Sequence, residues 1–158
     1  MDTARESLKV PKEGSEYVSR LTVPPHRANV GQSFYESFTL KGIRVDKVEP
    51  GFLSCTFKVP LRLTTANGEL SSGAIASLVD EIGYAVVHVE GQPMSVSVDM
   101  SISFLSTAKV NDELEISSRA LGQRGRYSGT AVLLRNKSTG EVIAEGRHSL
   151  FSVLASKI

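Results

Sequence analysis

Residues 71–80 read SSGAIASLVD, and they begin the longest amphipathic pattern of the chain. From here to about residue 90, apolar side chains recur at the three- and four-residue spacing of an α-helix. The period predicts one long helix over residues 71–90 with a broad apolar face made by Ala74, Ile75, Leu78, Val79, Ile82, Ala85, Val86 and Val89.

Asp80 lies nearly opposite the centre of that apolar face, at 100° of rotation per residue. A helix face in water normally carries Lys and Glu, but the neighbours of Asp80 on its side are small or apolar: Gly73, Ala76, Gly83 and Val87. We therefore expect a second surface, either a sheet or a partner subunit, to cover this side. That surface would leave Asp80 in a partly desolvated cleft.

The start of the predicted helix is small and uncluttered. Helix N-termini carry free N–H groups and the positive end of the peptide dipoles, so they can polarise a carbonyl oxygen. A carboxylate nearby can orient or deprotonate a water molecule. The combination predicts an acyl-hydrolysis site with no metal, no cofactor and no catalytic histidine. His148 is interpreted as structural, because the sequence places no Ser or Cys partner beside it.

The remaining pattern surrounds this helix with strands. A short helix is predicted over 33–40, and the turn signal Pro50-Gly51 predicts a hairpin of strands 43–49 and 52–59. After a loop over 60–70 and the long helix come four strands, 94–104, 113–122, 127–136 and 142–153. This order predicts an α+β domain over 33–155, with an antiparallel sheet wrapped around a long central helix. Residues 1–32 lack a sustained apolar period and are predicted to form an N-terminal arm.

Composition narrows the classes of function. The 158 residues are 41% hydrophobic and 22% charged with a net charge of +1, which argues against a dedicated nucleic-acid binder. No apolar run approaches the roughly 18 residues of a membrane span. The single Cys55 excludes an internal disulfide and fits a reducing compartment. Residues 156–158, Ser-Lys-Ile, differ in one residue type from the peroxisomal address Ser-Lys-Leu, so we expect a peroxisomal or a cytoplasmic protein.

Several short motifs occur in a characteristic order: LVD at 78–80, SVDM at 97–100, FLSTAK at 104–109, KSTG at 137–140 and AEGRH at 144–148. In order and spacing, residues 34–152 resemble the hotdog-fold acyl-CoA thioesterases, most closely the plant-type members of the acyl-coenzyme A thioesterase 13 family. The resemblance implies a hotdog fold and the hydrolysis of acyl-CoA thioesters to free acid and coenzyme A. It also implies a homo-oligomer, a dimer that pairs into a tetramer.

By resemblance, Asp80 and Ser97 orient or activate the attacking water, and the N–H of Ser72 holds the thioester oxygen. The resemblance further implies a set of substrate-binding residues: Thr65, Asn67, Ser71, Gly73, Phe104, Lys109, Gln123, Arg124, Gly125 and Arg126. The chain departs from the family at the helix start, where Ser71 replaces a His and Ser72 the first Gly. It departs again in the preceding loop, where Thr65 stands at the position of an Asn.

These departures leave a second hypothesis open, a non-catalytic acyl-CoA binding protein whose site has eroded at Ser71 and Ser72. A third, hydration of an enoyl thioester, ranks lowest because that chemistry needs a His beside an acid on the site helix, and His88 is too far along. The sequence leaves open the acyl group, the choice between coenzyme A and acyl carrier protein, and whether Asp80 acts as base or nucleophile.

Overall fold

The structure is a computed structural model that describes residues 2–25, 32–88 and 94–153. The chain divides between Tyr35 and Glu36 into two compact units. Each unit is described below by itself.

The first unit contains two short helices, α1 (Asp2–Ser7) and α2 (Lys12–Ser19). The sequence analysis did not predict these two helices, because neither is long enough to show an apolar period. Pro11 precedes α2 with a φ of −55°, a conformation that suits the residue before a helix start. No residue of α2 is buried, so these helices contribute no apolar core.

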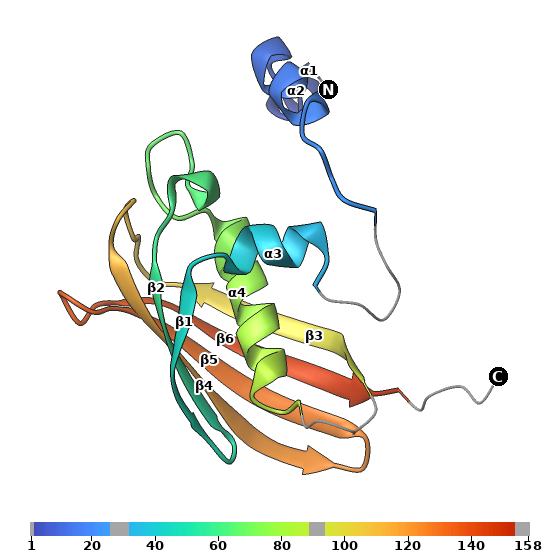
Figure 1. Cartoon of the computed structure of the whole chain (residues 1–158), viewed down its shortest axis with the longest axis vertical. Coiled ribbons are helices and arrows are strands. Elements are labelled where there is room, and N and C mark those ends of the chain that lie inside the picture. Colours follow the sequence, from blue (N-terminus) through green and yellow to red (C-terminus); the bar gives the residue numbers. More distant parts are fainter. Residues whose placement is uncertain (1, 26–31, 89–93, 154–158) are drawn as a thin grey trace. The chain divides into compact units, whose positions relative to one another are not determined.

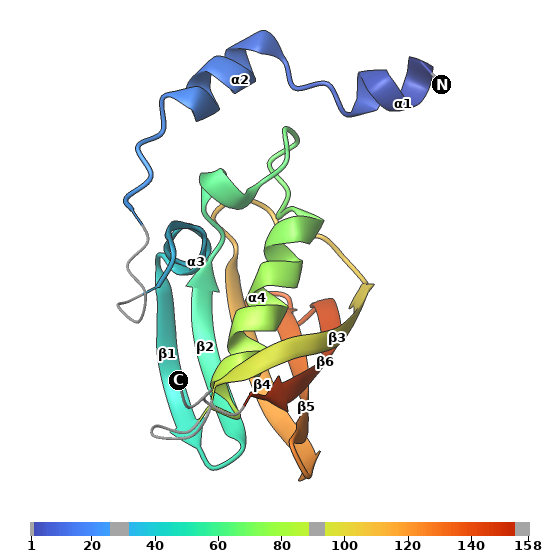
Figure 2. The ribbon, with the colours of Figure 1, turned by 90° about the vertical axis from the view of Figure 1, so that its right-hand side faces the viewer.

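The second unit is built on one six-stranded antiparallel sheet with the strand order β1-β2-β4-β5-β6-β3. The strands are β1 (Ile43–Glu49), β2 (Phe52–Lys58), β3 (Ser95–Phe104), β4 (Glu113–Arg124), β5 (Tyr127–Asn136) and β6 (Val142–Ser152). Each lies within two residues of its predicted bounds. The sheet curls, and helix α4 (Ser72–Ala85) crosses its concave face (Figures 1 and 2). This is the predicted α+β hotdog architecture.

Helix α4 buries the predicted apolar face only as far as Ile82. The buried side chains are Ala74, Ile75, Leu78, Val79 and Ile82, and they pack against the inner face of β2, β4, β5 and β6. The prediction placed the helix end near residue 90, but the helix ends at Ala85, and Ala85 itself is exposed. The β-branched pair that follows, Val86 and Val87, is poorly suited to continuing a helix. Val89 lies outside the described residues.

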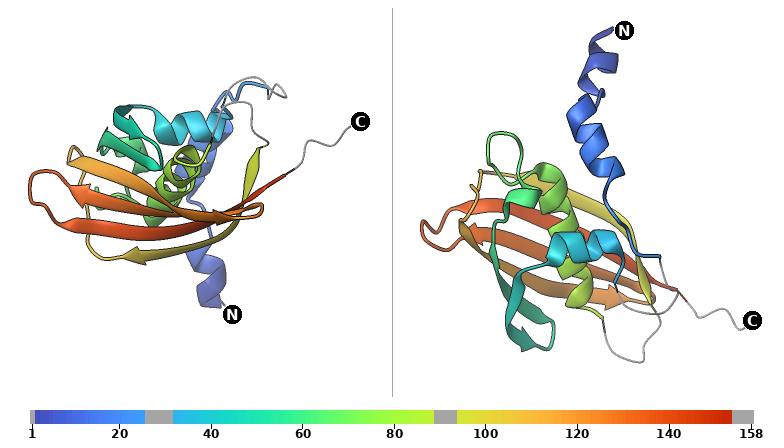
Figure 3. Two further views of the ribbon diagram at one scale, coloured as in Figure 1. Left: turned by 90° about the horizontal axis from the view of Figure 1, so that it is seen from below. Right: turned by 45° about the horizontal axis from the view of Figure 1, so that its top comes forward.

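Helix α3 (Phe34–Leu40) is fastened by a side chain from the 3-10 turn η1 (Leu61–Leu63). Arg62 donates from Nε to the carbonyl oxygen of Phe38 at 2.6 Å and also hydrogen-bonds the carbonyl oxygen of Lys41. The last carbonyls of a helix have no partner within it, so a guanidinium at this end satisfies them. The left view of Figure 3 shows α3 and α4 on the same side of the sheet.

The helix and the sheet approach most closely at Gly146 of β6. A Cβ atom at this position would lie 2.5 Å from Cγ1 of Val79 on α4. Real Cβ atoms do not approach other heavy atoms this closely, and both partners are buried in the core. The absence of a side chain at Gly146 therefore sets how deeply α4 sits against the sheet.

We expect Gly146→Ala to lower the free energy of unfolding by about 1–3 kcal/mol, because the added methyl group overpacks the core against Val79. Denaturant unfolding measures the effect. The matched control is Gly129→Ala on β5, where the nearest atom to the new Cβ lies 3.9 Å away. Equal stability of the two variants would contradict the close approach.

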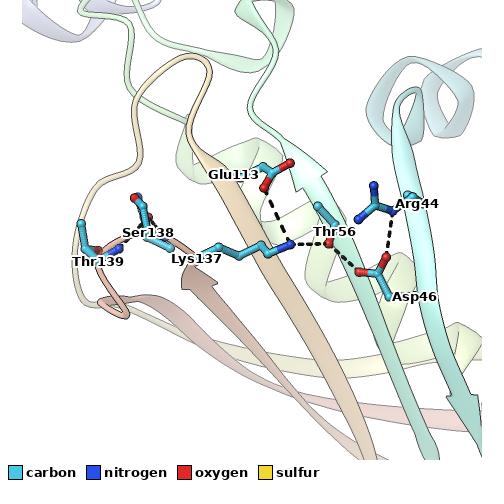
Figure 4. Close-up of polar contacts among 8 residues, drawn as sticks. Arg44, Asp46, Thr56, Glu113, Lys137, Ser138 and Thr139 are labelled. Atoms are coloured by element: carbon cyan, nitrogen blue, oxygen red, sulfur yellow. Dashed lines mark hydrogen bonds and ion pairs between the residues drawn. The ribbon is translucent and has the colours of Figure 1, made fainter.

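A polar network on the outer face of the sheet links three strands (Figure 4). Thr56 donates to Asp46 and accepts from Nζ of Lys137 at 3.2 Å, while Arg44 donates to Asp46 at 2.8 Å and Lys137 lies 3.7 Å from Glu113. The hydrogen bonds from Thr56 and Arg44 lower the pKa of the Asp46 carboxyl. Cys55 and Phe57, which flank Thr56 in β2, belong to the core. Because successive residues of a strand point to opposite faces of the sheet, Thr56 and its network lie on the face away from α4. It ties β1, β2 and β4 together.

Within the described residues, no helix is long and apolar enough to cross a membrane. The tail at residues 156–158 lies outside the described part of the chain, so its proposed targeting role stays a prediction.

Candidate functional site

The start of α4 offers backbone donors with no acceptor. Ser71 is the N-cap, and its hydroxyl accepts from the backbone N–H of Ala74 at 3.2 Å. Ser72 and Gly73 follow as the first two helical residues, both exposed. In the described part of the chain no group accepts from their N–H groups, as expected for the first turn of a helix. These donors are available to an oxygen outside the chain.

The serine at position 72 does not strain this turn. A glycine-type conformation with positive φ would make a Ser there costly. Among the described residues, however, the one non-glycine residue with positive φ is Asn111. Ser72 therefore presents its N–H from an ordinary helical backbone, and a serine at this position leaves a backbone N–H available.

Asp80 meets two side chains from the sheet on the next turns of the helix. Ser97 Oγ of β3 donates to Oδ1 of Asp80 at 2.6 Å. His148 Nε2 of β6 lies 3.2 Å from the same Oδ1 and 3.0 Å from Ser97 Oγ. Both contacts fall on Oδ1, and within the described residues Oδ2 carries no hydrogen bond. The Asp80 side chain is 43% exposed, so Oδ2 is accessible to water.

An irregularity in β3 turns Ser97 toward the helix. Ser97 pairs with Leu150 and Met100 with His148, with a register shift between Ser97 and Asp99. Residues paired across strands share a face, and Leu150 and His148 both point inward. The extra residue of the bulge therefore lets Ser97 and Met100, three positions apart, face the same side, which a regular strand forbids.

The geometry excludes a serine-hydrolase triad. In such a triad the His uses one ring nitrogen for the Ser and the other for the acid. Here Nε2 of His148 contacts both Ser97 and Asp80. Because a carboxylate only accepts, Nε2 carries the proton, and Nδ1 is the lone-pair nitrogen. Nδ1 is buried without a hydrogen-bond partner in the described part of the chain.

His148 is therefore a positioning group that holds Ser97 and Asp80 together. Burial lowers the pKa of His148, against a smaller opposing effect of the Asp80 charge, so the ring is neutral at physiological pH. The prediction that His148 lacks a Ser partner is wrong, since Ser97 lies beside it. The glycine at position 83 is the feature of the sequence that points to this contact. A Cβ atom there would lie 2.8 Å from Nδ1 of His148, so the small face of α4 leaves room for the imidazole ring.

The surroundings of Gly83 also show which surface covers the small face of α4. Its would-be Cβ meets Thr130 and Val132 of β5 as well as His148, so the covering surface at this point is the sheet. Beyond it, Asp80 opens into a pocket of about 220 Å³. The pocket is lined by Glu36, Asp80, Glu81, Tyr84, Met94, Ser95 and Ser97. The partly desolvated cleft expected around Asp80 is thus present.

The predicted substrate-binding residues gather at two places. The loop of Thr65 and Asn67 leads into α4, and Glu69 of the same loop pairs with Lys109 by an isolated bridge. This brings Thr65, Asn67, Ser71, Gly73 and Lys109 to one end of the second unit, together with the exposed Phe104 at the end of β3.

Gln123, Arg124, Gly125 and Arg126 lie at the other end, on the turn between β4 and β5. Tyr127, next in the chain, pairs with Phe151, which pairs in turn with Val96 near the start of β3. Since Phe104 lies eight residues farther along β3, roughly 26 Å of strand separates the two groups. One chain therefore does not bring them together.

The residues of this turn differ in whether their side chains already make hydrogen bonds. Arg126 donates to the carbonyl oxygen of Ser152 at 2.7 Å and stacks over Phe151. Gln123 donates to the carbonyl oxygen of Gly125 at 3.0 Å. Gln123 and Arg124 line a shallow pocket of about 330 Å³. Of the two arginines in this turn, Arg126 is held by these contacts, whereas Arg124 makes no side-chain hydrogen bond or ion pair within the described residues.

Comparison with known proteins places the chain in a family. The human acyl-coenzyme A thioesterase 13 is 41% identical to the chain over 101 residues, which cover 63% of this chain and 72% of the human protein. The chain belongs to the acyl-coenzyme A thioesterase 13 family. A model of the thioesterase superfamily matches residues 67–143, which include α4 and the strands β3, β4 and β5.

Solved structures agree on the fold of this family. Thioesterase superfamily member 2 from Mus musculus superposes with a TM-score of 0.69 at 34% identity, covering 75% of this chain and 87% of that one. A hypothetical thioesterase from Streptococcus pneumoniae, solved with coenzyme A, superposes with a TM-score of 0.67 at 23% identity and covers 72% of this chain and 90% of that one. Within the described residues, no group of three or more His, Cys, Asp or Glu side chains is arranged to hold a metal ion.

Proposed function

We propose that the chain hydrolyses acyl-CoA thioesters to a free acid and coenzyme A. Its family identifies it as a thioester hydrolase, and the relatives are named for acyl-coenzyme A. The observation that carries the proposal is the Asp80 carboxylate, which lines the pocket: its Oδ1 accepts from Ser97 and lies beside His148, while Oδ2 carries no hydrogen bond within the described residues. That arrangement suits a carboxylate that orients and deprotonates water.

In this mechanism a water bound to Oδ2 of Asp80 attacks the thioester carbon and gives its proton to the carboxylate. Ser97 and His148 hold Asp80 in one orientation. The N–H of Ser72 donates a hydrogen bond to the developing oxyanion, supported by the positive end of the α4 dipole. Ser97 acts as a positioning group because its hydroxyl proton is already committed to Asp80.

The site requires two subunits. Ser72 and Asp80 are eight residues apart on α4, about 12 Å along the axis, too far to act on one carbonyl group. Strand β3 is a sheet edge whose apolar side chains are exposed: Val96, Val98, Met100 and Phe104. Antiparallel pairing of β3 with a second copy would cover them and bring the Ser72 end of one α4 toward Asp80 of the partner.

The same pairing suits coenzyme A. It would bring Phe104 and Lys109 of one copy beside Arg124 and Arg126 of the other, since antiparallel strands join opposite ends. Arginine offers planar, bidentate donors for phosphate, and Lys109 adds a point charge. The tetramer, the plant-type relationship and the peroxisomal address are predictions that rest on the resemblance and on the tail sequence alone.

A panel of saturated, unsaturated and aryl acyl-CoAs, assayed for thiol release by the full chain, tests the function. We expect turnover of some members, in a preparation that light scattering shows to be a dimer or larger. Tight acyl-CoA binding without turnover would instead favour the non-catalytic binder with an eroded helix start. A monomer with full activity would contradict the shared site.

A further inference from the structure

The Asp80 pocket holds two neighbouring carboxyl groups in different surroundings. Asp80 and Glu81 are consecutive on α4 and both line the pocket, with Tyr84 one turn farther and Glu36 opposite on α3. Two hydrogen-bond donors converge on Asp80. Within the described residues, no donor reaches Glu81, which is half-buried.

The charges that face Glu81 are negative. Glu36 approaches it from α3 and Asp80 from its own helix. The other described residues that line the pocket from the sheet side are uncharged: Met94, just before β3, and Ser95 and Ser97 on it. Burial, reinforced by the charges of Glu36 and Asp80, raises the pKa of Glu81 to about 7. Tyr84 is neutral, because burial and the Glu81 charge raise the pKa of its phenol. Glu81 thus holds a proton near neutral pH, in a pocket whose other carboxyl is held as an acceptor.

When the surroundings of two carboxyl groups in one site push their pKa values apart, the group with the lower pKa can act as a base and the group with the higher pKa as an acid. Thioester hydrolysis needs both, because water must lose a proton and the departing sulfur must gain one. We propose that Glu81 is the general acid that protonates the coenzyme A sulfur as it leaves. The assignment rests on the proposed function, in which Asp80 is the base.

The proton balance closes within the pair. Water adds to the carbonyl carbon and its proton passes to Asp80; the tetrahedral intermediate then collapses, the C–S bond breaks, and the sulfur takes the bonding electrons and the proton of Glu81. The products are the acid and the free thiol. A proton transfer from Asp80 to the Glu81 carboxylate, within the shared pocket, restores both groups.

The test is the pH profile of kcat/KM for the oligomeric enzyme and for Glu81→Gln, which keeps the size of the side chain but holds no transferable proton. Because the acid must be protonated, wild-type activity falls as pH rises through about 7. In the variant we expect this alkaline limb to vanish and activity at pH 6 to fall by about 10²-fold, the lower end for general acids, since thiolates leave readily.

Glu36→Gln is the matched control. Removing the Glu36 charge lowers the pKa of Glu81, so the alkaline limb moves to lower pH while the plateau on its acid side is kept. A thioester of an acidic aryl thiol should depend less on Glu81 than the acyl-CoA does. If Glu81→Gln keeps the limb or the wild-type rate at pH 6, the acid assignment is wrong. A failure of the proposed function would give a different result. Either the wild type would show no acyl-CoA hydrolysis, or Asp80→Asn would hydrolyse acyl-CoA as fast as the wild type.

Discussion

Asp80→Asn is expected to lower kcat by about 10²- to 10⁴-fold, the range for loss of a general base, without loss of the fold. The amide oxygen of Asn accepts from Ser97 and His148 as the carboxylate does, so the side chain keeps its place. The amide cannot take a proton from water. Steady-state kinetics on the best acyl-CoA, with thermal unfolding alongside, measures both parts of this prediction.

The matched control is Asp99→Asn, which removes the same charge from β3. Asp99 is exposed and pairs with Ser149 on the face of the sheet away from Asp80. Because β3 is also the strand proposed to pair with a second copy, the two variants are compared in preparations that light scattering shows to have the same oligomeric state as the wild type. In such preparations we expect the kcat of Asp99→Asn to stay within a factor of about two of the wild type. A large loss of kcat in Asp99→Asn would mean that kcat depends on the net charge of the protein and not on Asp80 in particular. A near-normal kcat in Asp80→Asn would contradict the role of Asp80 as general base.

Most helices and strands of the second unit could be predicted from the sequence, because apolar residues recur at different spacings in a helix and in a strand. Alternation predicts β3 and β4 to within two residues of their bounds, and the three- and four-residue spacing predicts α4, which ends at Ala85 and not near residue 90. The same period does not say what covers an apolar face. The alternating residues of β3 predict a strand correctly, yet Val96, Val98 and Phe104 are half-exposed because β3 is an edge.

The candidate site was predictable only in part. The resemblance and the small helix face around the aspartate predict Asp80 and Ser97 as site residues, and the structure brings these two side chains together. His148 could not be, because its contact with Ser97 joins residues 51 positions apart and depends on the bulge in β3 and on the space at Gly83. Glu81 was passed over because a charged helix residue is ordinary until Glu36 is seen opposite it.

Ser72→Pro is expected to lower kcat by about 10²- to 10³-fold, the effect of removing one oxyanion donor. Proline is tolerated at the first helical position, where its missing N–H has no partner within the helix. The preceding Ser71 already has the extended conformation that proline requires, with φ −70° and ψ 147°. The substitution therefore deletes the donor and keeps the helix, and KM should change little because the donor acts in the transition state.

Ser72→Ala is its control, since alanine keeps the N–H and removes the hydroxyl. We expect this variant to retain near-wild-type kcat. If the alanine variant falls as far as the proline variant, the hydroxyl of Ser72 carries the function and the backbone donor does not. Equal activity of the proline variant and the wild type would place the oxyanion donor elsewhere.

Co-expressing Ser72→Pro and Asp80→Asn chains tests whether these two groups act across a subunit boundary. In a mixed dimer, one site would combine the intact Ser72 N–H of the Asn chain with the intact Asp80 of the Pro chain. The other site would lack both. Random pairing makes half of the dimers mixed, so about one quarter of wild-type activity should return. If each chain supplied both groups to its own site, every site would lack one, and mixing would restore nothing. Recovery would therefore establish the shared site without a structure of the oligomer.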